Sequence, residues 1–197
     1  MSESQRKILE SDLLAPADYA AKRGELRSAS IARKKNRRIE VGPFATFYFE
    51  SYESMWLQVQ EMLRIEKGGA EQIPGELEAY NPLIPQGREL IATMMLEIED
   101  AHRRDRVLRT LAGIEEKVFL EFAGERIRAT PTSYEDRTTP DGKTSSIHWV
   151  RFTFSDEQVA KFRRSEGSAV LGIDHGNYGH MAMIAPAVRE ELARDFA

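Results

Sequence analysis

The clearest pattern in the chain is an amphipathic repeat from Met55 to Glu66, with the sequence MWLQVQEMLRIE. At about 100° per residue, its apolar positions fall on one arc of a helical wheel. Those positions are Met55, Trp56, Val59, Met62, Leu63 and Ile65. The pattern predicts a helix that begins near Glu53 and ends at Gly68-Gly69, because tandem glycine is typical of a helix C-terminus. We expect this helix to cover one face of a sheet.

The polar residues of the same segment supply the first candidate site. Glu66 projects into the apolar arc, whereas Gln60, Glu61 and Arg64 lie on the opposite side. A carboxylate among apolar side chains needs an ion pair or hydrogen bonds, so Glu66 is expected to be partly enclosed. The alternative is that Glu66 turns to water, because it lies in the last helical turn.

Alternating apolar residues predict β-strands in three segments, Ile39–Ser51, Arg88–Glu99 and Ser145–Phe154. The first is interrupted at Gly42-Pro43, which favours a bulge or a strand that begins at Phe44. The second is apolar on both faces and is therefore expected to be a central strand. This places Glu97 beside a covered surface, as a second candidate for an enclosed carboxylate.

The remaining elements complete an α+β pattern. Further helices are expected over residues 17–35, 71–80, 101–112, 156–164 and 187–196, and further strands over 117–122, 126–132, 169–174 and 181–185. We expect a single α+β domain over residues 16–197, after a loosely ordered lead over residues 1–15. Alternatively, this domain is divided into two sub-lobes, residues 16–114 and 115–197. The predicted sheet is antiparallel or mixed, has six or seven strands, and carries helices mainly on one face.

Composition narrows the classes of function. The chain has 197 residues, a net charge of −4 and no cysteine, which excludes disulfides, thiolate metal ligands and cysteine nucleophiles. No apolar run is long enough to span a membrane, and a cytoplasmic location is expected. Phosphate-loop, dinucleotide and serine-hydrolase motifs are absent. A basic run, Arg33–Arg38, is either a solvated helix end or an anion or nucleic-acid patch.

The last predicted hairpin holds the candidate metal ligands. Asp174, His175 and His180 lie in or beside its turn, and His148 on another strand could supply a further ligand. Directly across a hairpin, the Cβ atoms of His175 and His180 would be about 5 Å apart. Such imidazoles with carboxylates bind zinc, iron or nickel. The alternative is an exposed pair without metal, with His148 a core histidine that donates to a backbone carbonyl.

Several stretches of the sequence together resemble a bacterial and archaeal family, domain of unknown function 3501 (DUF3501). They are VGPFATFYFES (Val41–Ser51), QVQEMLRIE (Gln58–Glu66), YNPLIP (Tyr80–Pro85), ATMMLEIED (Ala92–Asp100) and LGIDHGNY (Leu171–Tyr178). The resemblance implies no assigned activity and no catalytic residues. It implies a genomic neighbourhood of rubrerythrin-like di-iron proteins and heterodisulfide-reductase-like iron–sulfur proteins, which suggests redox or oxidative-stress work by association.

The main hypothesis is an accessory or ligand-binding protein of a cytoplasmic redox system. Its candidate ligand-binding residues are Glu61, Arg64, Glu66, Asn81 and Glu97. One alternative is a small metal-dependent enzyme that uses His175, His180 and carboxylates with a transition metal as cofactor. The other is anion or nucleic-acid binding through Arg33–Arg38. Whether the protein is an enzyme, and its oligomeric state, stay open at this point.

Overall fold

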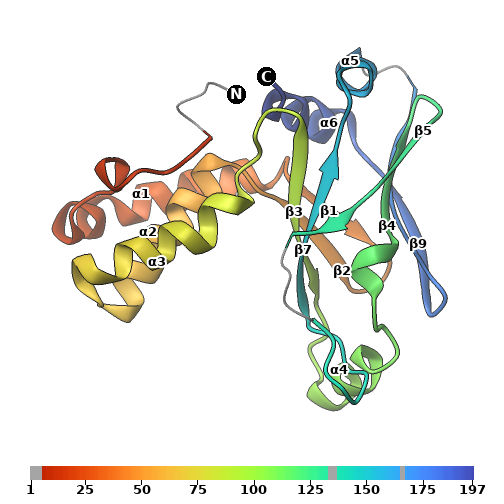
Figure 1. Ribbon diagram of the computed structural model, residues 1–197, viewed down its shortest axis with the longest axis horizontal. Coiled ribbons are helices and arrows are strands. Elements are labelled where there is room, and N and C mark those ends of the chain that lie inside the picture. Colours follow the sequence, from red (N-terminus) through yellow and green to blue (C-terminus); the bar gives the residue numbers. More distant parts are fainter. Residues whose placement is uncertain (1–5, 133–136, 165–166) are drawn as a thin grey trace.

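The computed structural model describes residues 6–132, 137–164 and 167–197. These residues form an α+β fold with two antiparallel sheets, which confirms the predicted class. Figure 1 shows helices α1, α2 and α3 gathered on one side of the larger sheet, and the smaller sheet on its other side. Within the described part of the chain, no helix combines the length and the apolar character needed to cross a bilayer.

The larger sheet has five strands in the order β1-β2-β3-β7-β6. Their bounds are β1 Arg38–Val41, β2 Ala45–Phe49, β3 Glu89–Leu96, β7 Ile147–Thr153 and β6 Thr130–Pro131. The middle strand, β3, pairs with β2 through Met94 opposite Phe47 and with β7 through Met94 opposite His148. The prediction of a central strand at this position is therefore confirmed.

The smaller sheet has four strands in the order β5-β4-β8-β9. Their bounds are β5 Glu125–Arg128, β4 Val118–Phe122, β8 Ala169–His175 and β9 Tyr178–Met183. The described residues thus form nine strands in two sheets, so the expectation of one sheet with six or seven strands was wrong. β7 follows β4 and β5 of the smaller sheet in the sequence, yet it pairs with β3 of the larger sheet, a partner distant in the sequence.

Helices begin and end near the predicted bounds. They are α1 Pro16–Lys34, α2 Tyr52–Glu66, α3 Ile73–Tyr80, α4 Ala101–Leu108, α5 Asp156–Arg164 and α6 Pro186–Leu192. Short 3₁₀ turns are η2 Glu10–Asp12, η3 Gly69–Gln72, η4 Asn81–Leu83, η5 Ile114–Lys117 and η6 Ala193–Asp195. The hydroxyl of Ser51 accepts from the Ser54 N–H at the start of α2, and the Asp100 carboxylate caps α4.

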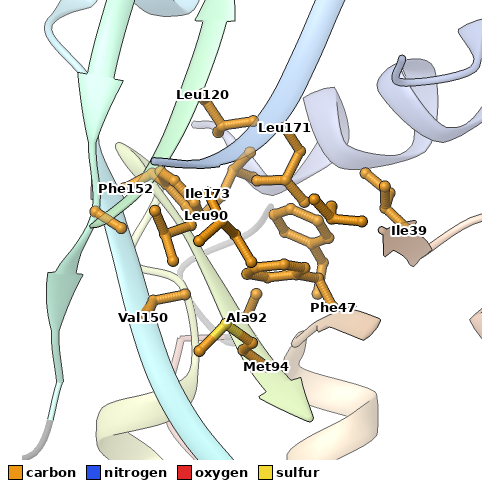
Figure 2. Close-up of a cluster of buried hydrophobic side chains, with 14 of the residues drawn as sticks. Ile39, Phe47, Leu90, Ala92, Met94, Leu120, Val150, Phe152, Leu171 and Ile173 are labelled. Atoms are coloured by element: carbon orange, nitrogen blue, oxygen red, sulfur yellow. The ribbon is translucent and has the colours of Figure 1, made fainter. Parts of the chain in front are cut away.

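The core has two parts, one on each face of β3. Between the sheets, Leu90 of β3 and Phe47 of β2 meet Leu120 and Leu171 of the smaller sheet, as Figure 2 shows. On the other face, Ile91 packs in a cluster under the helices, whose buried members also include Ile8, Met55, Val59, Leu83 and Ile84. The larger sheet is therefore the middle of three layers.

Two local expectations differ from the structure. Gly42 does not form a bulge but lies in the turn of the β1–β2 hairpin, with a positive φ of 71° that glycine adopts readily. The lead is not loose from Arg6 onward, because Ile8 is fully buried. The Asn81 side chain accepts from the Ile8 N–H at 2.7 Å and donates to the Ile8 carbonyl at 3.1 Å.

Candidate ligand-binding site

A cavity of about 670 Å³ lies between the lead, α1 and the C-terminal half of α2. Its apolar lining comes from Leu13, Leu14, Pro16, Tyr19, Leu63 and Ile73. Four further lining residues are polar: Glu10, Gln60, Arg64 and Lys67. A mostly apolar hollow of this size with a few polar groups is typical of a small-molecule site.

One wall of the cavity is fixed by an ion pair between α1 and α2. Arg23 donates from Nε and Nη2 to the two oxygens of Glu61, at 2.7 and 2.9 Å. The Tyr19 hydroxyl donates to Glu61 Oε1 at 2.5 Å. The hydrogen bonds from Arg23, and that from Tyr19, lower the pKa of Glu61 to about 2, while burial raises the pKa of Tyr19. Glu61 thus links α1 to α2, and both of its carboxylate oxygens already accept hydrogen bonds from the protein.

The most informative polar group of the cavity is Gln60. Its side chain is only 2% exposed, and its Nε2 atom has no hydrogen-bond partner among the described residues. Gln60 was placed opposite the apolar arc, and it is nevertheless buried, because α1 packs on α2. Sequence reasoning also missed Tyr19 and Arg23 as site residues; the Tyr19-x₃-Arg23 spacing, one helical turn, was the available signal. A buried amide donor without an acceptor is costly in a folded protein.

Two cationic side chains line the same cavity. Arg64 follows Gln60 on α2 by four residues, so these two lie along one side of the helix, and Lys67 is the residue that ends the helix. Both are exposed. In the part of the chain that the structure describes, neither forms a salt bridge. Glu10 contributes one opposing charge, which leaves an excess of positive charge around the opening.

The other candidate carboxylates are not enclosed. Glu66 is exposed at the last position of α2, where it accepts a hydrogen bond from Gln72 Nε2 at 2.8 Å. Glu66 is therefore not enclosed and agrees with the alternative in which it turns to water, because the last three residues of α2 are exposed. Glu97 follows β3 and is also exposed, with its Oε2 accepting from Thr46 Oγ1 at 2.7 Å. Glu66 and Glu97 thus have different hydrogen-bond partners and do not form one site.

The predicted metal ligands of the last hairpin do not face one another. A tight turn pairs His175 with Tyr178 and His180 with Ile173, so the directly opposed histidine pair was wrong. His175 Nδ1 accepts from the Asn177 N–H at 3.2 Å, and its Nε2 lies 3.3 Å from the Ala112 carbonyl. The exposed His180 ring packs against Tyr178, with ring centroids 4.5 Å apart. Asp174 is exposed and pairs with Gly179.

His148 is separate from that hairpin and buried in β7. Its Nε2 donates to the Ser145 carbonyl at 2.9 Å, as in the core-histidine alternative. Its Nδ1 lies 3.4 Å from Glu115 Oε2, and burial lowers the pKa of His148. Within residues 6–132, 137–164 and 167–197, no three or more His, Asp or Glu side chains are grouped to hold a metal ion. The metal-dependent alternative therefore gains no support from these residues.

The basic run Arg33–Arg38 does not form one continuous patch. Arg37 is buried and pairs with Asp195 and with the backbone carbonyls of Phe49 and Glu50, so it links the β1–β2 hairpin to the C-terminal segment. Arg38 pairs with Glu40 at 2.7 Å. Only part of the run is therefore available at the surface.

Fold and cavity together define an α+β protein with two stacked sheets and a ligand-sized hollow within its helical layer. The family model described as "Protein of unknown function (DUF3501)" matches residues 7–196, so the chain belongs to this family. It is also similar to a crystal structure from Burkholderia pseudomallei, described as a novel protein of unknown function. That similarity has a TM-score of 0.88 and 33% identity, over 97% of this chain and 100% of the other. The comparison with curated proteins gives no match.

Proposed function

We propose that this protein binds a small carboxylate with an apolar body in the cavity between the lead, α1 and α2. The observation that carries the proposal is the Gln60 amide, which is buried in the wall of this cavity and whose Nε2 lacks an acceptor among the described residues. Because native proteins satisfy nearly all buried donors, an acceptor from a bound molecule is the natural complement.

The surrounding residues indicate the chemistry of the ligand. Leu13, Leu63 and Ile73 provide apolar contact for its body. A carboxylate between Gln60 and Arg64 would accept from the amide and pair with the guanidinium, since the two side chains are one helical turn apart. The ion pair of Glu61 with Arg23 holds the cavity wall, so that little ordering is required when the ligand binds.

Calorimetric titration with decanoate tests this function, with decanol and decyltrimethylammonium as probes of the same apolar length. We expect saturable binding of decanoate alone. Gln60→Leu and Arg64→Gln should each weaken it about tenfold, the equivalent of one charge-assisted hydrogen bond. Lys22→Gln, an exposed cation on α1 outside the cavity lining, is the matched control and should leave binding unchanged.

Three results would overturn the proposal. One is the absence of saturable decanoate binding to folded protein, another is equal affinity for the three probes, and the third is unchanged affinity in Gln60→Leu. The stability of the ligand-free protein gives a separate check. Removal of the unpaired amide should leave the free energy of unfolding of Gln60→Leu equal to that of the native protein or higher.

We further propose that the protein acts as an accessory to cytoplasmic redox proteins. This role is supported by the family resemblance alone, through its association with rubrerythrin-like and heterodisulfide-reductase-like proteins. Affinity capture from native cells followed by mass spectrometry tests it. Recovery of no di-iron or iron–sulfur protein at native abundance would count against this role.

A further inference from the structure

The outer edges of the two sheets lie against each other. β1 is an edge strand of the larger sheet, β9 is an edge strand of the smaller one, and the two are in contact. At one end of this contact the Tyr178 hydroxyl donates to the Val41 carbonyl at 2.7 Å and accepts from the N–H groups of Phe44 and Ala45. At the other end the strands border a groove of about 510 Å³.

In both strands, alternate residues direct their backbone N–H and C=O groups away from the paired strand of their own sheet and toward this contact. The Phe49 N–H donates to the Arg37 carbonyl, so alternate residues of β1 bond to β2 and the backbone of Arg38 and Glu40 faces outward. In the same way, the Ile184 N–H donates to the Ala169 carbonyl, and therefore the backbone of Met181 and Met183 faces away from β8. Two sheet edges with outward N–H and C=O groups thus border one groove.

The side chains around the groove combine apolar surface with positive charge. Ile31 and Met183 line it and are 61% and 63% exposed, and Met181, two residues away on β9, is 69% exposed. The cations that line it are Lys34, Lys35 and Arg38, opposed by Glu40 alone. Large apolar groups are seldom left in water next to a sheet edge, because such edges promote association.

We propose that this groove binds an extended acidic segment of a partner protein by β-strand addition. The outward backbone groups of β1 or β9 would hydrogen-bond the added strand. Its apolar side chains would contact Ile31 and Met183, and its alternate carboxylates would meet Lys34 and Lys35. A peptide fits better than nucleic acid, because Arg37 points into the protein and the floor of the groove is apolar. The site is separate from the ligand cavity and does not rest on the function proposed above.

Fluorescence anisotropy of the full chain with a labelled peptide of alternating Glu and Val tests the proposal. We expect saturable binding that weakens as salt is raised, and no binding of a Lys-Val peptide. Methylation of alternate backbone amides of the Glu-Val peptide should abolish binding, because it removes strand hydrogen bonds and keeps the charge. The double variant Lys34→Glu/Lys35→Glu should lose at least tenfold in affinity. Lys22→Glu/Lys117→Glu makes the same change in net charge away from the groove and should bind normally.

Several outcomes would overturn the inference. They are no binding of the Glu-Val peptide, equal binding of the methylated peptide, or equal effects of the two double variants. Displacement of the bound peptide by a single-stranded oligonucleotide of similar charge would instead assign a general anion patch. Sedimentation that shows a dimer, dissociated by Met183→Lys, would assign the groove to a second copy of this chain.

Discussion

Glu61→Gln is the most direct test of how the helical layer is held on the protein. In the native protein the Glu61 carboxylate receives two hydrogen bonds from Arg23 and one from Tyr19, which tie α1 to α2. Glutamine keeps the size of the side chain and can still accept from Tyr19, but it carries no charge. The variant therefore removes the ion pair with little change in packing.

The pKa of Glu61 gives the magnitude. Its ordinary value of 4.5 is lowered to about 2, and a difference of one in pKa corresponds to about 1.4 kcal/mol. The full difference would therefore stabilise the folded state by about 3 kcal/mol. Because the side chain is 19% exposed, solvent screens part of this interaction. We expect Glu61→Gln to lower the free energy of unfolding at pH 7 by about 1–2 kcal/mol.

The effect should depend on pH in a defined direction. The pKa of Glu61 is lower in the folded than in the unfolded chain, so its contribution is complete above about pH 4.5 and is lost as the pH falls toward about 2. The difference between native protein and variant should therefore be largest near pH 7 and smaller at about pH 3.5. Urea unfolding measures it, followed by tryptophan fluorescence and by circular dichroism. Trp56 packs edge-on against Tyr19, so its fluorescence reports on the contact between α1 and α2.

Glu66→Gln on the same helix is the control, because Glu66 is exposed. A loss in Glu61→Gln that is equal at both pH values would refute the electrostatic argument, since only the charged form receives the extra stabilisation. A loss below about 0.5 kcal/mol at pH 7 would place this ion pair among ordinary surface pairs.

Three further variants test other parts of the fold. Tyr178→Phe leaves two buried backbone groups and one partly buried backbone group of the β1–β2 hairpin without their partner and should cost about 2–3 kcal/mol in urea unfolding; native-like stability would contradict this. Gly172→Ala places a Cβ 2.3 Å from Cζ of Phe119 and should lower the free energy of unfolding by about 1–3 kcal/mol. The double variant Gly172→Ala/Phe119→Leu should lose less stability than the sum of the two single variants, and simple additivity would argue against the clash. Glu66→Ala should change the free energy of unfolding by less than about 0.5 kcal/mol; a larger loss would mean that its carboxylate is enclosed.

The candidate site shows where local patterns stop being informative. The sequence predicted a helix with Met55 and Val59 on its buried arc, and both are buried. It assigned Gln60 and Glu61 to the side opposite that arc, because a helical wheel describes one helix against one surface. In the protein α2 packs on the sheet through Met55 and Val59, and it packs on α1 on another side. Glu61 is therefore paired with Arg23 of α1, and Gln60 lines the cavity.

The sequence by itself determined the helices, most of the strands and the central position of β3, because side-chain periodicity and caps act over a few residues. Only the tertiary structure decided the division into two sheets, the pairing of β7 with β3 and the register that separates His175 from His180. Strand partners and registers depend on contacts between distant segments, and several pairings can satisfy the same alternation. For the same reason, the cavity at Gln60 and the groove between β1 and β9 exist only once those segments have packed.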